Sequence, residues 1–400
     1  MVTLAVVLFW GAAALLGYTY LAFPALVLVR GLLHPRPPAA GDITPSVSMI
    51  IAAHNEAAVI GAKIENLSAL DYDRDQLEVI IASDGSTDGT DEIVAGSRAG
   101  RSGHVRLLSL SRGGKAAALN AGVAASTGEI LVFSDANSLY APDALRVLVR
   151  PFADPDVGGV AGDQRYRESR EPCRDAAWSA AGERSYWALD RFLKVCESRS
   201  GNVISATGAI YAIRRELFEP IPDGVTDDFF TSTGVIARGK RLVFAPDAVA
   251  YEPPAPSGSM EFARKVRVIT RGLRAVQTRR DLLDPRRHGF YALQLLSHKI
   301  LRRLMVVPLT ALLAASVALA VTGDPLYQAI AAGQALFYGC AGLGLARPRR
   351  AKILQLPAYF CLANAAAAQA VWNCNRGVRI DRWEPARAGE APAAGLPAQG

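Results

Sequence analysis

An uncharged apolar segment at the amino terminus restricts the possible folds of this chain more than any other feature. Residues Leu4 to Val29 contain no Asp, Glu, Lys or Arg, and Arg30 follows directly. A membrane-spanning helix needs roughly 20 apolar residues, whereas the apolar core of a secretory signal peptide has about 7–15. We therefore predict an uncleaved transmembrane anchor over residues 1–30, with a cleaved signal peptide as the alternative. A Pro-rich linker over residues 31–45 follows the anchor.

The carboxyl-terminal part of the chain contains three further apolar segments that predict transmembrane helices over residues 304–373. They are Leu304–Val321, Leu326–Ala346 and Ile353–Trp372, and the third is the least typical because it is Ala-rich and contains Pro357 and Asn364. A transporter also has several spans, but these segments offer no buried charge pair. Residues 374–400 are rich in Ala, Gly and Pro and predict a partly disordered tail.

A basic stretch over residues 258–303 precedes these segments. From Glu261 to Arg303 there are twelve Lys or Arg and three Asp or Glu, which is +9 of a chain whose net charge is +7. Basic residues beside a membrane span favour the cytoplasmic face and anionic lipids. The same charge could bind nucleic acid, but the adjacent spans make a nucleic-acid partner a poor interpretation. We expect an integral protein of a bacterial-type inner or plasma membrane, with its soluble domain in the cytoplasm.

Apolar residues recur at three- and four-residue steps within this stretch and predict an amphipathic helix over Glu261–Arg280. The stripe consists of Phe262, Val266, Ile269, Leu273 and Val276. A basic amphipathic helix of this kind can lie in the lipid headgroup layer. The alternative is a solvated charged helix that packs on the soluble domain.

Strands alternate with helices in the first part of the soluble region, residues 46–257. Short apolar runs predict strands, and longer amphipathic segments predict helices. This order indicates an α/β fold with a mainly parallel sheet. The predicted strands are Ser46–Ala53, Leu77–Ala82, Val105–Ser109 and Ile130–Ser134, and the predicted helices are Ala57–Leu70, Asp88–Ala99 and Lys115–Ala125.

Polar residues follow these strands where an α/β sheet binds its ligands, at the carboxyl ends of the strands. They include His54-Asn55-Glu56 after the first strand, Asp84 after the second and Asp135 after the fourth. Arg112-Gly113-Gly114-Lys115 begins a helix, and its glycines and lysine can hold a phosphate. The spacing of a Walker loop is absent, and no dinucleotide-binding glycine fingerprint follows the first strand.

Two groups of acidic or amide side chains suggest chemistry. Asp135 and Asn137 are one residue apart after a strand and can bind a hard cation, although an ordinary turn is the alternative. Asp227 and Asp228 are adjacent, and their mutual repulsion tends to raise the pKa of one carboxyl group. Such a group suits a general base, whereas Thr226 or Asp227 could instead cap a helix.

These motifs, in this order, resemble those of the family 2 glycosyltransferases over about residues 46–275. The resemblance is to the membrane branch that includes cellulose, chitin-oligosaccharide and hyaluronan synthases. The matching residues are Ala53-His54-Asn55-Glu56, Asp84, Gly114-Lys115 with Ala118-Leu119-Asn120, Asp135-Ala136-Asn137, Thr207-Gly208 and Thr226-Asp227-Asp228.

The resemblance implies a GT-A fold, with a Rossmann-like mixed sheet, and a role for each matched residue. Mg²⁺ or Mn²⁺ would lie between Asp135 and Asn137, and Asp228, beside Asp227, would deprotonate the acceptor. Thr207 and Gly208 would contact the acceptor. The residues implied to bind the donor are Ala53, Asn55, Glu56, Asp84, Lys115, Asp135, Arg264, Arg267 and Arg271.

The chain departs from the family pattern at two positions. The second Asp of the metal motif is Asn137, and the family's Gln-x-x-Arg-Trp motif is reduced to Arg264-Lys265-Val266-Arg267-Val268, with Arg271 as a rival for its Arg. The second departure weakens the prediction of processive polymer synthesis.

The function that the resemblance implies is a membrane-bound, inverting glycosyltransferase. It would transfer a sugar from a nucleotide-diphosphate sugar, with a UDP-sugar favoured, to a glycan or a lipid-linked acceptor, and polysaccharide synthesis is one form of this activity. The alternatives are a non-processive transferase that adds one sugar to a lipid and a catalytically silent membrane partner.

Overall fold

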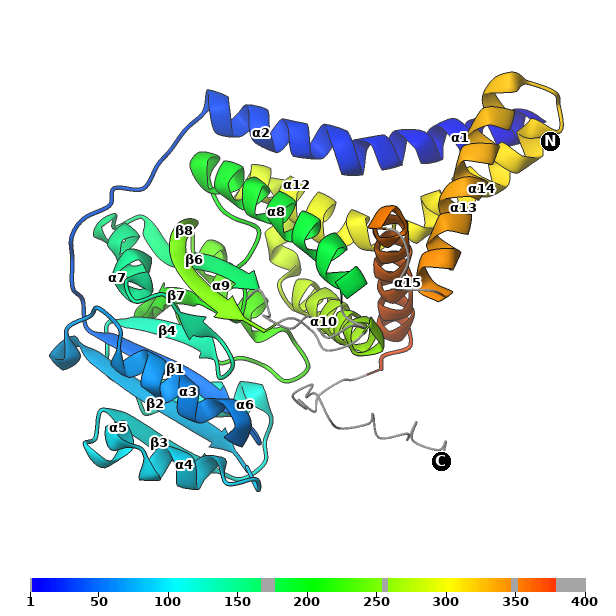
Figure 1. Cartoon of the computed structure of the whole chain (residues 1–400). Helices are drawn as coiled ribbons and strands as arrows, with labels where there is room; N and C mark the ends of the chain where they lie inside the picture. Colours follow the sequence, from blue (N-terminus) through cyan, green and yellow to red (C-terminus); the bar gives the residue numbers. More distant parts are fainter. Residues whose placement is uncertain (1, 167–176, 254–257, 347–351, 379–400) are drawn as a thin grey trace.

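The computed structural model describes residues 2–166, 177–253, 258–346 and 352–378 (Figure 1). Residues 379–400 of the predicted tail lie outside these ranges. An eight-stranded sheet forms the centre of the soluble domain, with strand order β3-β2-β1-β4-β7-β6-β8-β5. The strands are β1 Val47–Ala53, β2 Leu77–Asp84, β3 Val105–Leu110, β4 Ile130–Asp135, β5 Leu139–Tyr140, β6 Val157–Tyr166, β7 Tyr211–Arg214 and β8 Arg241–Glu252.

The sheet is mixed, as the family resemblance implied, and its longer pairings are parallel, including that of β6 with β8. β1 is parallel to β2 and β4, and β2 is parallel to β3, as the alternation of strands and helices predicts. β7 is antiparallel to β4 and β6, and β5 is antiparallel to β8. The four predicted strands form one parallel half, and every antiparallel pairing involves at least one strand that the sequence pattern did not mark.

Helices cover both faces of the sheet, so successive side chains of its inner strands enter two different cores. In β1, Met49 and Ile51 pack with Ile60 and Ile64 of one helical layer, whereas Ile50 packs in the core on the opposite face. The helices and 3-10 turns that precede β7 are α3 Ala57–Ser68, η2 Arg74–Gln76, α4 Thr90–Gly96, α5 Arg98–Arg101, α6 Lys115–Ala124, α7 Ala144–Val149, η3 Arg150–Ala153 and α8 Ala177–Ser200.

The predicted helix over residues 88–99 is two short helices in the structure. α4 ends at Gly96, and α5 begins at Arg98, because Ser97 adopts an extended backbone between them. The Ser97 hydroxyl accepts a hydrogen bond from the Gly100 backbone N–H, so Ser97 caps the second helix.

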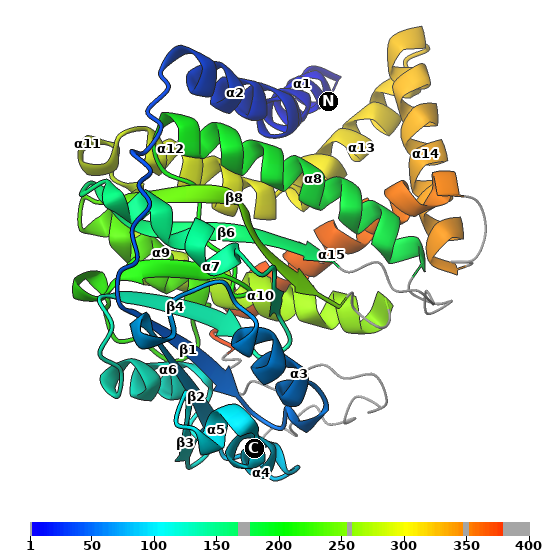
Figure 2. The ribbon, with the colours of Figure 1, turned by 60° about the vertical axis from the view of Figure 1, so that its left-hand side comes forward.

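The chain after β7 consists of β8 and mostly helical segments. These are η4 Arg215–Leu217, α9 Asp227–Ala237, α10 Gly258–Thr278, η5 Arg280–Leu283, α11 Pro285–His288, α12 Phe290–Leu295, the π-helical η6 Leu296–Ile300, η7 Leu301–Arg303, α13 Val306–Ala320, α14 Pro325–Ala346, η8 Lys352–Leu354 and α15 Gln355–Asn375. Figure 2 shows α8 between the sheet and the amino-terminal helix.

Two helices among the described residues are long and apolar enough to cross a membrane. One is the continuous stretch Val2–Leu33, which comprises α1 Val2–Gly17, the π-helical η1 Tyr18–Ala22 and α2 Phe23–Leu33. The other is α14. A bent pair, Phe290–Arg303 with Val306–Ala320, adds a third if it is one span. α1, α13 and α14 extend together away from the sheet (Figure 1).

The fourth predicted span, residues 353–372, is not among these candidates. Its helix, α15, packs against α8 and α10 of the soluble domain. Ala367 and Ala370 of α15 contact Ile269 of α10, and the small alanines allow this close approach. Two residues of the predicted apolar stripe are therefore covered by protein. Ile269 contacts α15, and Val276 lies in the hydrophobic core beneath the sheet. These contacts favour a charged helix that packs on the soluble domain over a helix that lies in the lipid headgroup layer.

Candidate active site

The parallel half of the sheet brings three predicted polar segments to one edge. In the register of β1, Ala53 is opposite Ser83 of β2, and Ala52 is opposite Asp135 of β4. The residues that follow these strands therefore share the carboxyl edge of the sheet. This is where a ligand crevice is expected in an open α/β sheet.

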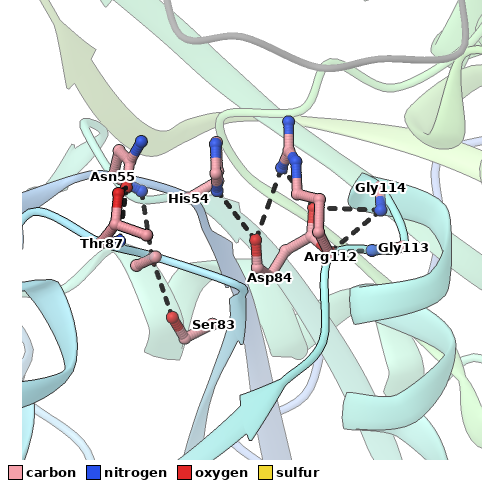
Figure 3. A network of polar contacts seen from close by, with 9 residues as sticks. His54, Asn55, Ser83, Asp84, Thr87, Arg112, Gly113 and Gly114 are labelled. Atoms are coloured by element: carbon pink, nitrogen blue, oxygen red, sulfur yellow. Dashed lines mark hydrogen bonds and ion pairs between the residues drawn. The ribbon is translucent and has the colours of Figure 1, made fainter.

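Asp84 lies at the centre of a hydrogen-bond network at this edge (Figure 3). Its side chain is 1% exposed and accepts hydrogen bonds from the backbone N–H groups of Gly113 at 2.6 Å and Gly114 at 2.9 Å. Arg112 forms an ion pair with the same carboxylate. The glycine amides that were predicted to hold a phosphate are thus already occupied by Asp84. The network instead fixes the loop before α6 against the end of β2.

The residues after β1 are held in place by the loop after β2. Asn55 has a positive φ of 51°, a conformation that Asn tolerates better than most residues, and its side-chain oxygen accepts a hydrogen bond from Thr87 N at 2.8 Å. His54 Nδ1 donates to the Asp84 carbonyl oxygen at 2.8 Å. Ala53 is buried in the core, and Glu56 is nearly buried. Asn55 and Asp84 therefore lie in two loops that hydrogen bonds join to each other, and their role in donor binding stays a prediction.

Lys115 connects the predicted metal motif to the predicted catalytic pair. Its ammonium group lies 2.7 Å from Asp135 Oδ1 and 3.0 Å from Asp227 Oδ2. Burial alone would lower the pKa of Lys115, but the two carboxylates outweigh burial and raise it well above its ordinary value. Lys115 is therefore a fixed positive charge at the first residue of α6.

The Asp135 carboxylate also lies against the turn that contains Thr207 and Gly208. A Cβ atom on Gly208 would lie 2.8 Å from Asp135 Oδ2, so only glycine leaves room for this carboxylate. The Thr207 hydroxyl is buried and has no hydrogen-bond partner among the described residues. The two predicted acceptor residues are thus beside the predicted metal ligand.

Asp135 and Asn137 suit a cation that also binds a substrate. One carboxylate and one amide supply oxygen atoms, which hard divalent cations prefer. In the described ranges no group of three His, Cys, Asp or Glu side chains could hold a metal by itself. A cation here would take its remaining ligands from water and from a bound diphosphate, as Mg²⁺ commonly does.

Asp227 and Asp228 begin α9, and their environments move their pKa values in opposite directions. Burial opposes ionisation of Asp227, but Lys115 and Arg271 outweigh it and lower the pKa of this carboxyl group. Burial, together with the negative charge of Asp227, raises the pKa of Asp228 to about 6. The backbone N–H of Phe229 donates to Asp228 Oδ1 at 2.6 Å. Asp228 is therefore the member of the pair whose pKa suits proton transfer near neutral pH.

The three predicted arginines of α10 have different surroundings. Arg271 is nearly buried and donates two hydrogen bonds to the Val225 carbonyl oxygen, at 2.6 and 3.0 Å. Arg264 forms an ion pair with Glu261 at 2.8 Å. Arg267 is half-buried on the same helix. Of the three, Arg271 is tied to the segment that leads into Asp227.

Sequence reasoning missed three charged residues near the site. Lys63 is fully buried beneath the loop after β4, and burial lowers its pKa to about 7 against the opposing charges of Asp135 and Glu252. Burial and the charge of Asp135 raise the pKa of Glu252 to about 7. Lys299 lies 5.4 Å from the Phe229 ring centre. Lys63 interrupts the apolar face of a predicted helix, and this interruption was the sequence signal that could have revealed it.

Comparison with known proteins identifies the family of this chain. Residues 45–282 match the family model described as glycosyltransferase like family 2. A beta-monoglucosyldiacylglycerol synthase of Nostoc is 30% identical over 227 residues, which are 55% of this chain and 47% of that protein. A poly-beta-1,6-N-acetyl-D-glucosamine synthase of Staphylococcus aureus is 25% identical over 228 residues, which are 56% of this chain and 53% of that protein. The chain thus spans about half the length of these relatives.

A solved structure extends the likeness beyond the sheet. The mannosyltransferase of Pyrobaculum calidifontis, in complex with GDP-Man and Mn²⁺, has a TM-score of 0.68 and 27% sequence identity. The match covers 92% of this chain and 99% of that one, so it extends well beyond the sheet. The family match over more than half of the chain and the GT-A-like sheet lead to one conclusion: this chain is a glycosyltransferase of the family 2-like group.

Proposed function

We propose that the protein is a membrane-bound, inverting glycosyltransferase that uses a nucleotide-diphosphate sugar, with a UDP-sugar as the favoured donor. The observation that carries this proposal is the contact of Lys115 with both Asp135 and Asp227. It places a predicted cation ligand, a fixed positive charge and the carboxylate pair of α9 at one edge of the sheet. Diphosphate binding and proton transfer from an acceptor require these groups together.

The donor diphosphate would lie between Asp135 and the first turn of α6. A Mg²⁺ or Mn²⁺ ion held by Asp135 and Asn137 would neutralise charge on the leaving diphosphate. Mn²⁺ in the complex of the Pyrobaculum mannosyltransferase supports this choice of ion. Lys115 would stabilise the same negative charge from the protein side. Asp84 and Asn55, held rigidly after β1 and β2, would form the wall for the nucleoside.

Asp228 would act as the general base. The acceptor hydroxyl oxygen attacks the anomeric carbon, the bond from that carbon to the diphosphate oxygen breaks, and the hydroxyl proton moves to Asp228. A single displacement of this kind inverts the anomeric centre. The raised pKa of Asp228 supports its role as the proton acceptor, whereas the lowered pKa of Asp227 keeps that residue ionised beside Lys115.

The acceptor would be a lipid or a lipid-linked glycan at the membrane surface. Two observations support this assignment: α1, α13 and α14 extend beside the domain, and one relative is named as a glycolipid synthase while another is named as a polymer synthase. The absent Gln and Trp of the family's pyrophosphate motif favour transfer of one sugar over processive synthesis. The basic residues before α13 favour a cytoplasmic catalytic domain.

The test uses the full chain, purified in detergent, with UDP- and GDP-sugars and lipid or glycan acceptors. We expect release of one nucleotide diphosphate in the presence of Mg²⁺ or Mn²⁺, together with a product whose anomeric configuration is opposite to that of the donor. The Asp228→Asn variant serves as the control. A protein that binds and turns over none of these donors would be a silent membrane partner instead.

A further inference from the structure

Lys63 is a charged residue in the interior of the soluble domain. It lies on α3 between Ile60 and Ile64, which face the apolar core, and its side chain is 0% exposed. An apolar side chain would satisfy packing at this position. A buried ammonium group costs free energy unless hydrogen bonds and opposite charges compensate it. Its contacts therefore indicate what the lysine does there.

All the contacts of the Lys63 ammonium group are with the segment that contains the predicted metal ligands. It donates to Ser134 Oγ at 2.8 Å and to the Ser138 carbonyl oxygen at 2.5 Å, and it lies 4.3 Å from the centre of the Tyr140 ring. Two of the three N–H donors of this ammonium group are therefore accepted by oxygen atoms of Ser134 and Ser138. Ser134 and Ser138 stand immediately on either side of the Asp135–Asn137 segment. Lys63 thus joins the two ends of this segment.

The same segment is fastened from the other side by buried groups. The Ser138 hydroxyl donates to Glu252 Oε1 at 2.5 Å, and Gln164 donates to Glu252 Oε2 at 2.5 Å. The Ser134 hydroxyl accepts from Lys63 and lies 3.1 Å from the Ala209 carbonyl oxygen, to which it donates. Ala209 follows Gly208, so the network also reaches the turn that lies against Asp135.

We propose that Lys63 is a positioning residue for the cation site. Its hydrogen bonds to Ser134 and Ser138 tie together the two ends of the Asp135–Asn137 segment. The carboxylate and amide oxygens are thereby held in the geometry that a divalent cation requires. Lys63 itself touches neither the cation nor a substrate. This inference rests on the proposed function. Partners that orient metal ligands commonly change metal affinity or activity by about 10- to 100-fold when they are removed.

The first experiment measures Mn²⁺ binding directly, by the loss of the electron paramagnetic resonance signal of free Mn²⁺ in the presence of UDP. Lys63→Met keeps most of the side-chain volume and removes the ammonium group. We expect the half-saturating Mn²⁺ concentration to rise by about 10-fold or more. Turnover should recover largely at saturating Mn²⁺, because Lys63 touches no substrate. Ile64→Ala is the matched control, since it makes a cavity in the core on the same helix and removes no side-chain hydrogen bond.

A structural role alone would lower the thermal unfolding temperature of both variants and leave Mn²⁺ affinity unchanged. A folded Lys63→Met protein with wild-type Mn²⁺ affinity therefore overturns the inference. If Lys63→Met does not fold, Ser134→Ala decides, because it removes the side-chain acceptor of Lys63 without burying a new charge. We expect Ser134→Ala to weaken Mn²⁺ binding by roughly 10-fold, and unchanged binding overturns the inference. A wild-type protein that binds no Mn²⁺ contradicts the proposed function as well.

Discussion

Gly208 lies against the carboxylate of Asp135 so closely that no side chain fits between them. A Cβ atom at position 208 would be 2.8 Å from Asp135 Oδ2, well inside van der Waals contact. The turn before β7 and the end of β4 are far apart in sequence, and the antiparallel pairing of these strands brings them together. Gly208 is therefore needed to leave space for the predicted metal ligand. It is not needed for an unusual backbone conformation, because its φ is not positive.

Gly208→Ala should reduce transfer strongly because the added methyl group pushes the Asp135 carboxylate away from its position. We expect a loss of about 10- to 100-fold in activity, with a matching rise in the Mn²⁺ concentration needed for half-maximal rate. Gly201→Ala is the control, since a Cβ there meets no atom within 4 Å. Equal transfer rates for Gly208→Ala and Gly201→Ala would show that transfer does not depend on the position of the Asp135 carboxylate.

Asp228→Asn should abolish most of the transfer reaction and leave donor binding nearly intact. The amide cannot accept the acceptor proton, and losing a general base typically costs a factor of about 10²–10⁴ in rate. The measurement is single-turnover product formation beside nucleotide binding by calorimetry. Asp227→Asn is a useful comparison, because it should weaken the contact to Lys115 and impair donor binding also. Near-normal turnover of Asp228→Asn would exclude this base.

The transfer rate should depend on pH through Asp228. The pKa of this group is raised to about 6, so the carboxyl group is mostly protonated below that pH and cannot accept a proton. We expect kcat/KM for the acceptor to rise as pH increases through about 6 and then to level off. Asp228→Asn should retain only a low rate without this rise. A wild-type profile that is flat from about pH 4 to about pH 8, roughly two units on either side of the pKa, contradicts the assignment.

Metal dependence should be absolute, and it should respond to the residue at position 137. Excess EDTA should stop transfer, because Lys115 is already paired with two carboxylates and cannot neutralise a diphosphate alone. Asn137→Asp adds a charged ligand and should lower the Mn²⁺ concentration for half-maximal rate. Titration of each protein with Mn²⁺ tests both points, and full activity in EDTA would rule out the metal.

Arg267 and Arg271 should differ in what their removal changes. Arg271→Ala should lower both turnover and the unfolding temperature, because two hydrogen bonds to Val225 hold the segment before Asp227. Buried hydrogen bonds from a charged group contribute about 1.5–3 kcal/mol. Arg267→Ala should lower turnover at saturating donor, as its position in the family's pyrophosphate motif implies. Wild-type turnover in both variants would mean that α10 has no part in catalysis.

The sequence alone was sufficient to predict the parallel half of the fold and to name most of the polar residues that the structure gathers at the candidate site. β1, β2 and β4 are buried on both faces and read as continuous apolar runs, and a polar residue marks the end of each. The family motifs then identified the chain correctly, because Asp84, Asp135 and Asp228 stand in a characteristic order. Local patterns of this kind depend on side-chain chemistry within one segment, and a sequence displays them directly.

Long-range contacts decided the rest. The antiparallel position of β7 depends on its neighbours in the sheet, and α15 packs on α10 because alanines meet Ile269, a pairing that no local period encodes. The occupation of the Gly113 and Gly114 amides by Asp84 also became visible only in three dimensions. Lys63 shows the physical reason most clearly. A single lysine on an apolar face is visible in the sequence, but its partners are not. Only the fold places its ammonium group against the loop after β4, where burial strengthens each of its contacts.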